Sequence, residues 1–296
     1  LYNIHQELDG KNLEINIVPV LATVLDRIKV LDTFKRYAID TVYHAAAYKH
    51  VPMVEMNPID GIRNNVIGTY NCVRSAIESD VDTFILISTD KAVRPTSVMG
   101  ATKRFSELIL QAAETISKDT IFSIVRFGNV LKSSGSVLTI FDKQIKNKGP
   151  VTVTDKRVKR FFMSVEEAVS LIIQSSALSG ENRRFVLDMG DQLSVYNIAK
   201  KMILLNGFSI KDDSNPDGDI AIKIIGLKKG EKLEEELFQS SANLIKTEHK
   251  MISKINEKLP ILDIDKFFKL LDENYKNNNI HFLYDLMNKI QNKDIV

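Results

Sequence analysis

Residues 83–103 read Thr-Phe-Ile-Leu-Ile-Ser-Thr-Asp-Lys-Ala-Val-Arg-Pro-Thr-Ser-Val-Met-Gly-Ala-Thr-Lys, and no other stretch says as much about the architecture. Residues 83–87 have the length and apolar composition of a buried strand. Residues 88–91 therefore place a hydroxyl, a carboxylate and an amine at the carboxyl end of a strand. Open α/β sheets bind their ligands at that end of the strands, so we expect a ligand site here.

A helical pattern begins shortly after Pro95, which separates it from the strand. In this pattern Met99 and Lys103 are four residues apart and share one face of the helix. The hydroxyl of Thr89 at the strand end should face that helix. The segment thus predicts a site built from one strand end and one helix.

Strand-like and helical stretches alternate on both sides of this segment. Strands are expected at residues 15–21, 41–46, 83–88 and 120–127, and helices at residues 26–37, 59–78 and 98–117. Repeated β-α-β units force a parallel sheet with helices on both faces. The predicted fold class is α/β, with a Rossmann-type doubly wound parallel sheet.

The elements become shorter after residue 128. Strands are expected at 151–153 and 185–187, helices at 165–178 and 195–205, and a loop at 211–218. After Lys250 the chain is rich in Lys, Asn and Asp, and the spacing of its apolar residues predicts a peripheral helical pair; these residues are Ile261, Phe267, Leu270 and Leu271. Three regions result: 1–128 for the main sheet, 129–255 for a smaller α/β substrate-binding region, and 256–296 for a helical tail.

One feature of dinucleotide-binding folds is missing from the sequence, namely the glycine-rich turn between the first strand and the first helix. Residues 15–21 resemble the third strand of such a fold rather than its first. We expect the given chain to begin inside its domain, without the first β-α-β unit. The alternative is a protein that has no phosphate loop.

Composition excludes several classes of function. The chain has 296 residues, and its 40 basic and 38 acidic side chains nearly cancel, which argues against nucleic-acid binding. No Cys/His cluster suggests a metal site, and the single cysteine, Cys72, fits a reducing compartment. No signal peptide or membrane-length apolar run is present, so we expect a cytoplasmic protein whose membrane anchor, if any, lies outside this sequence.

Five motifs in this order resemble the extended short-chain dehydrogenase/reductase superfamily. They are His44 to Pro52 (HAAAYKHVP), Asn64 to Thr69 (NNVIGT), Ser88 to Lys103, Val125 to Val130 (VRFGNV) and Gly226 to Lys232 (GLKKGEK). Together they resemble the UDP-N-acetylglucosamine 4,6-dehydratases of polysaccharide biosynthesis, in the capsule-type branch that has Met in place of the usual Tyr. The resemblance covers about residues 15–255.

The resemblance implies an internal redox cycle with bound NAD. Hydride leaves C4 of the sugar, the C5 proton and the C6 hydroxyl are eliminated as water, and hydride returns to C6. It also implies the catalytic roles. Thr89 would contact the C4 hydroxyl, Asp90 would act as the acid at C6, and Lys91, neutral in some fraction, would remove the C5 proton. Lys103 would bind the nicotinamide ribose, and Met99 would pack near the sugar without acting as a base.

Further binding residues follow from the same resemblance. The expected cofactor contacts are Thr23 at the adenine, Ala45, Ala46 and Ala47 at the dinucleotide backbone, Lys49, and Asn65 with a supporting role. The expected contacts to the UDP-sugar are Lys49, His50, Asn129, Ser136, Val137, Arg160, Lys228 and Glu231. Lys228 stands where the family usually has arginine, so it lacks the bidentate fork of that side chain.

Other interpretations remain for these residues. Asp90 and Lys91 could be an exposed turn pair, Met99 a core methionine, and Glu231 a helix cap. For the whole chain, the alternatives are a UDP-sugar 4-epimerase, which needs the missing tyrosine, and a non-catalytic dinucleotide-binding scaffold. We also expect a homo-oligomer, in which the helices at 59–78 and 98–117 could pair across a two-fold axis.

Overall fold

The computed structural model describes residues 1–257 apart from 12, 118, 132, 134, 179–182, 240 and 241, together with residues 269, 273, 282 and 285. Its centre is a six-stranded sheet in the order β1-β2-β3-β8-β13-β12. The strands are β1 (Thr41–His44), β2 (Thr83–Ile87), β3 (Ile121–Arg126), β8 (Arg184–Leu187), β13 (Ile252–Asn256) and β12 (Asn243–Lys246). The first four are parallel, and β13 pairs antiparallel with both β8 and β12. The parallel part of the sheet confirms the α/β class with a doubly wound parallel sheet.

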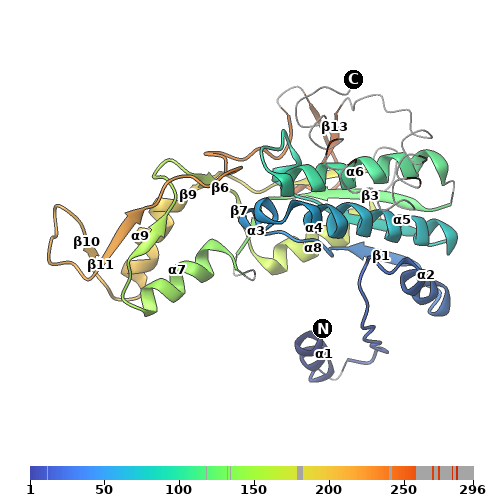
Figure 1. Cartoon of the computed structure of the whole chain (residues 1–296), viewed down its shortest axis with the longest axis horizontal. Coiled ribbons are helices and arrows are strands. Elements are labelled where there is room, and N and C mark those ends of the chain that lie inside the picture. Colours follow the sequence, from blue (N-terminus) through green and yellow to red (C-terminus); the bar gives the residue numbers. More distant parts are fainter. Residues whose placement is uncertain are drawn as a thin grey trace.

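Helices cover both faces of this sheet (Figure 1). One face carries α2 (Arg27–Arg36), α5 (Gly68–Glu78) and α6 (Val98–Ile116). Between these helices and the sheet lies a core of buried apolar residues, among them Phe84, Phe105 and Phe122. The other face carries α8 (Val165–Ala177), which packs on a second core around Phe185. Burying apolar surface on both faces is what makes β2, β3 and β8 nearly continuous apolar runs.

The helix expected at residues 59–78 is present but is not uniform. It consists of α4 (Pro58–Ile62), a π-helical turn at Arg63–Ile67 and α5, preceded by the short α3 (Val51–Met56). Single π-turns inside α-helices rotate the side chains that follow them and are frequent at functional sites. This one contains Asn65, whose contacts are described below.

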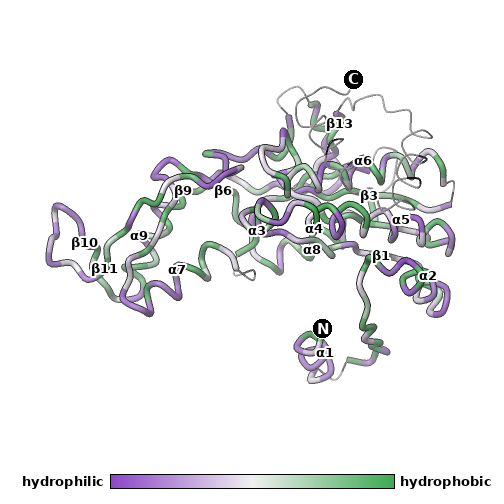
Figure 2. Tube along the Cα trace, viewed as in Figure 1, coloured by the Kyte–Doolittle hydropathy of each residue, from purple (hydrophilic) through white to green (hydrophobic). Residues whose placement is uncertain are grey.

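A smaller layer extends away from the main sheet (Figure 1). It combines α7 (Val137–Lys146) and α9 (Val195–Leu205) with a parallel sheet of β10 (Ile210–Lys211), β11 (Ile220–Ile224) and β5 (Val151–Val153). Along α9 the tube alternates between hydrophilic and hydrophobic (Figure 2), as expected for a helix with one buried face. Two short pairs connect the layers: β4 (Asn129–Val130) with β7 (Phe162–Met163), and β6 (Lys159–Arg160) with β9 (Leu193–Ser194).

Two expectations from the sequence are wrong. Residues 15–21 form no strand, and Ile15 and Leu21 are 67% and 87% exposed. A strand needs a neighbour for its backbone hydrogen bonds, and among the described residues none lies beside the outer edge of β1. The chain after Lys250 does not begin a tail, because β13 joins the large sheet. The helical pair expected around Ile261 to Leu271 lies outside the described residues.

The chain leaves the large sheet and returns to it. The strands β8, β12 and β13 fall inside the region 129–255 or at its end, yet they extend the sheet that β1 to β3 begin. The first helix, α1 (Tyr2–Asp9), lies apart from this body in Figure 1. No helix in the described part of the chain is long and apolar enough to cross a bilayer.

Candidate active site

The segment after β2 forms a tight turn at the carboxyl edge of the sheet. Thr89 caps a short 3₁₀ turn at Asp90–Ala92, and its Oγ1 accepts a hydrogen bond from the backbone N–H of Lys91 at 3.4 Å. The same hydroxyl donates to Asp90 Oδ1 at 2.7 Å, and Lys91 Nζ donates to that oxygen at 3.0 Å. Asp90 and Lys91 are therefore not an exposed turn pair.

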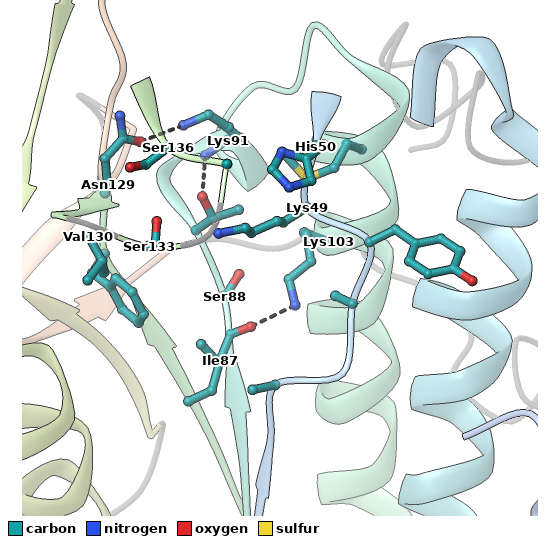
Figure 3. A pocket seen from close by; sticks show the side chains of 18 of the residues that line it. Lys49, His50, Ile87, Ser88, Lys91, Lys103, Asn129, Val130, Ser133 and Ser136 are labelled. Carbon is teal, nitrogen blue, oxygen red and sulfur yellow. Dashed lines mark hydrogen bonds between the residues drawn. The ribbon is translucent and has the colours of Figure 1, made fainter. Parts of the chain in front are cut away.

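Lys91 is held by oxygens from three parts of the chain. Besides Asp90, its Nζ donates to Asn129 Oδ1 at 3.3 Å and lies 3.5 Å from Glu235 Oε1 (Figure 3 shows the contact with Asn129). Burial disfavours the ammonium ion, but the carboxylates of Asp90 and Glu235 outweigh it and raise the pKa of Lys91. In this arrangement Lys91 is a cation, and not the partly neutral amine that the sequence led us to expect.

Asp90 is completely buried behind Thr89 and Lys91. Its Oδ2 is buried and has no hydrogen-bond partner. Gly128 lies against it: a Cβ added there would come within 3.2 Å of Oδ2 and 2.7 Å of the Cβ of Phe161. Asp90 can therefore reach a ligand through the two side chains in front of it, and any side chain at residue 128 would disturb this packing.

Met99 and Lys103 occupy the helix opposite this turn, as predicted. Ser97 caps α6 by accepting a hydrogen bond from Gly100, which fixes the first turn of the helix. Met99 is 3% exposed, and Lys103 Nζ donates to the backbone oxygen of Ile87 at 2.6 Å (Figure 3). Burial lowers the pKa of Lys103 from 10.5 to about 8, against a smaller opposing effect of Glu107.

The lowered pKa of Lys103 predicts a pH-dependent stability. Between about pH 8 and 10.5 the unfolded chain binds a proton at Lys103 that the folded chain does not, so stability should rise across this window. The full change is about 3 kcal/mol. Denaturant unfolding of wild type and Lys103→Met at several pH values measures this change. Subtracting the two curves of unfolding free energy against pH cancels the contributions of all other titrating groups. Equal slopes for both proteins would contradict this prediction.

Asn65 supports the loop after β1 and does not line a cavity. Its Oδ1 accepts from the N–H of Tyr48 at 2.7 Å, and its Nδ2 donates to the oxygen of Tyr48 at 3.0 Å and to Thr102 Oγ1 at 2.9 Å. The amide is 1% exposed and its hydrogen-bonding capacity is used within the protein. These contacts agree with the supporting role expected for Asn65, which fixes the loop of residues 45–50, and they leave its amide no free group for a direct cofactor contact.

Two cavities meet at Lys91. The first, about 340 Å³, lies between the loop after β1, the end of β2 and α6, and is lined among others by Ala45, Ala47, Thr89, Met99, Lys103 and Ser136. The second, about 310 Å³, lies toward the smaller layer and is lined among others by Thr154, Arg160, Lys228, Glu231 and Glu235. Both are lined by Lys49, His50, Lys91, Asn129 and Val137. In Figure 3, Lys49 lies between Lys91 and Lys103.

Three expected ligand contacts have other roles in the structure. Arg160 Nη1 and Nη2 donate to the backbone oxygens of residues 159, 232 and 233 and to Glu231, so this buried guanidinium mainly clamps the loop beside the second cavity. Glu231 is not a helix cap, because the described residues directly after it, 232–239, form no helix; it accepts from the N–H of Lys228 and from Thr154. Thr23 is exposed, accepts from Leu25 and lines neither cavity.

Ala46 also lines neither cavity, whereas its neighbours Ala45 and Ala47 line the first.

The structure shows two buried residues that the sequence analysis missed. Glu235 faces Lys91. The other residue is His44, whose Nε2 forms a hydrogen bond with Thr69 Oγ1 at 2.9 Å. Burial and the nearby Lys103 lower the pKa of His44 to about 3, so it is neutral. His44 is the first residue of the HAAAYKHVP motif, but nothing in the sequence marks Glu235 within its run of three glutamates.

Comparison with known proteins shows which family the chain matches. A sequence model described as "Polysaccharide biosynthesis protein" matches residues 1–257. The capsular polysaccharide biosynthesis protein CapD of Staphylococcus aureus is 45% identical over 244 residues, covering 81% of this chain and 39% of that protein. A UDP-N-acetylglucosamine 4,6-dehydratase (inverting) of Campylobacter jejuni strain 81-176 is 32% identical over 235 residues, covering 78% and 66%. The chain spans about two fifths of the length of the CapD protein.

Solved structures show the same fold. The structure of Pen from Bacillus thuringiensis has a TM-score of 0.75 and 31% identity, with 87% of this chain and 76% of that chain covered. DesIV from Streptomyces venezuelae, a dTDP-glucose 4,6-dehydratase with NAD and TYD bound, has a TM-score of 0.66 at 17% identity, with 79% and 74% covered.

Proposed function

Because the chain belongs to the polysaccharide biosynthesis protein family that its residues 1–257 match, we propose that it is a nucleotide-sugar 4,6-dehydratase acting on UDP-N-acetylglucosamine. One observation carries the proposal. A hydroxyl, a buried carboxylate and an amine, from Thr89, Asp90 and Lys91, form one hydrogen-bonded unit where two cavities meet. An elimination of water needs both an acid and a base in one place, and this unit offers both.

The first cavity fits the nicotinamide half of NAD. Its wall has only methyl side chains at Ala45 and Ala47, which leaves room for a close approach, and Lys103 offers an amine at the same wall for ribose hydroxyls. When bound, NAD supplies the hydride acceptor and donor that oxidation at C4 and reduction at C6 require. No residue of this chain is assigned to the pyrophosphate, because the sequence contains no glycine-rich phosphate loop.

Thr89 connects the sugar to Asp90. Its hydroxyl lines the first cavity and donates to Asp90 Oδ1 at 2.7 Å, so a proton taken from the C4 hydroxyl can pass through Thr89 to the carboxylate. The same path in reverse delivers that proton to the oxygen that leaves C6 as water. Asp90 then acts as the acid through Thr89, which agrees with its complete burial.

Lys91 is the base at C5 in this proposal. It lines both cavities, so its amine can reach a sugar whose nucleotide occupies the second. Lys91 must first lose its resting proton. Protonation of Asp90 removes one of the two carboxylates that hold this proton, which makes its loss easier.

The two alternatives are less well supported. An epimerase would use a tyrosine where this chain has Met99, which has no proton to exchange. A scaffold has no need of a buried Asp90 hydrogen-bonded to Thr89 and Lys91, an arrangement that is costly to bury. A cytoplasmic location and assembly as a homo-oligomer belong to the same proposal.

Mass spectrometry of the sugar separates the three functions. Full-length protein is incubated with UDP-N-acetylglucosamine and NAD. A dehydratase releases a product lighter by one water, an epimerase gives a product of unchanged mass but a new configuration, and a scaffold leaves the sugar as it was. Either of the last two results would refute the proposed function.

A further inference from the structure

Glu235 is a buried carboxylate beside the proposed base. It lies in the loop after β11, and Gln192 fixes its backbone by donating to the oxygen of Glu235 at 3.0 Å and accepting from its N–H at 3.4 Å. The residue is 4% exposed and lines the second cavity. Gln192 thus holds Glu235 at a fixed place near Lys91.

Charges rather than hydrogen bonds stabilise this carboxylate. The nearest cationic nitrogens are Lys91 Nζ at 3.5 Å and Arg160 Nε at 4.0 Å from Oε1, and Lys232 Nζ at 3.9 Å from Oε2. Oε2 is buried and has no hydrogen-bond partner. Asp90 Oδ2 is likewise buried without a partner, but Asp90 accepts two hydrogen bonds at Oδ1, whereas the carboxylate of Glu235 accepts none from the described residues. Of the two carboxylates that face Lys91, Glu235 is therefore the less stabilised as an anion.

We propose that Glu235 is a positioning residue that accepts the resting proton of Lys91 when the nucleotide sugar binds, and so frees the amine for C5. This inference rests on the proposed function. The step moves one proton: the ammonium of Lys91 and the carboxylate of Glu235 become an amine and a carboxylic acid. The amine then takes the C5 proton and later returns it, and after product release Glu235 gives the resting proton back.

Substrate binding favours this transfer electrostatically. The groups that face the Lys91–Glu235 pair are the anion Asp90 and the cations Arg160 and Lys232. A nucleotide diphosphate in the second cavity brings negative charge toward Arg160 and Lys228, which line it. That charge offsets Arg160 and Lys232, which lie within 4.0 Å of the Glu235 carboxylate and keep it ionised, so the affinity of Glu235 for a proton rises. The same charge raises the proton affinity of Lys91, so the transfer requires the effect on Glu235, which these two cations contact, to be the larger. Burial already raises the pKa of Glu235, while Lys91 opposes the rise.

Glu235→Gln tests the proposal, because the amide keeps the shape but accepts no proton from Lys91. At about pH 7 we expect kcat to fall about 100-fold with an almost unchanged KM, and exchange of the C5 proton with deuterated solvent to fall equally. Toward about pH 9 the variant should recover, because solvent then removes the proton of Lys91 before the substrate binds, whereas the wild type should change little.

Two further variants serve as controls. Glu234→Gln removes the preceding, exposed carboxylate, which pairs with Lys159, and should behave as wild type. Glu235→Asp keeps a carboxyl group and should retain activity at neutral pH within about 10-fold of wild type. The recovery of Glu235→Gln with pH is a ratio within one protein, so it does not depend on how much of the preparation is folded.

Three outcomes would overturn the inference. A wild-type rate for Glu235→Gln at neutral pH would mean that Glu235 only holds Lys91 as a cation. A low rate at every pH would mean that Glu235 only supports the fold. A wild-type protein that releases no water from the sugar would overturn the proposed function, and this inference with it.

Discussion

Replacing Lys91 by methionine is expected to lower the rate of sugar dehydration by about 10³-fold to 10⁴-fold and to abolish exchange of the C5 proton with solvent. Methionine has a similar length but no proton to exchange. No other amine of the described residues is hydrogen-bonded to Asp90. Without Lys91, the ketone at C4 can form but its neighbouring proton has no base.

The measurement combines single-turnover kinetics with deuterium incorporation at C5. Lys201→Met, an exposed lysine on α9, is the matched control and should leave both unchanged. In Lys91→Met, Asp90 keeps Thr89 as a hydrogen-bond donor but loses the lysine. Because this loss could affect folding, UDP binding is measured in parallel to give the fraction of folded protein. Deuterium exchange at the wild-type rate in Lys91→Met would remove Lys91 from the mechanism.

The part of the fold that the sequence predicted correctly consists of elements with a strong local signal. Residues 83–87 and 98–116 have apolar patterns that extend over the whole element, and β2 and α6 match them. The paired strands β4, β6, β7 and β9 have two residues each, which is too short for any periodicity. Residues 15–21 have a strand-like pattern, but a strand also needs a neighbour, which no local pattern contains.

The residues of the site likewise divide into those with a local sequence signal and those placed only by tertiary packing. Thr89, Asp90, Lys91, Met99 and Lys103 were predictable together because they belong to one strand–turn–helix segment. Glu235 is 143 residues beyond Ala92, the last residue of that segment's turn, in the run Glu234, Glu235, Glu236, and only tertiary packing buries the middle one. Arg160 was expected at a diphosphate because of its charge, but the loop oxygens that surround it are visible only in the fold.

Among changes to the residues that support the site, removing Glu107 is expected to destabilise the folded protein most. Glu107 is completely buried on α6 and receives two hydrogen bonds of 2.7 Å from Arg126 at the end of β3, one of 2.9 Å from Arg104 and one of 2.6 Å from Ser88. Glu257, after β13, completes the cluster through Arg126. These contacts connect α6 to three strand ends, and Ser88 directly precedes Thr89.

Glu107→Ala should lower the free energy of unfolding by about 3–5 kcal/mol, because Arg126 would remain buried with half of its partners missing. Replacing Glu107 and Arg126 together by Leu and Met should cost less than the sum of the single changes, since no charge is then left unpaired. Denaturant unfolding measures all three proteins. Glu114→Ala, an exposed carboxylate on the same helix, is the control and should change stability by less than about 0.5 kcal/mol.

The pH dependence provides an independent check on Glu107. Burial disfavours its charge, but Arg126 and Arg104 outweigh this and lower the pKa of Glu107 from 4.5 to about 2. The ionised carboxylate therefore contributes stability above pH 4.5, and this contribution is lost as the pH falls toward about 2. Glu107→Ala should lose less stability than wild type across that window. If both proteins lose the same amount, the cluster does not depend on the charge of Glu107, and the large cost expected for its removal would have to come from packing alone.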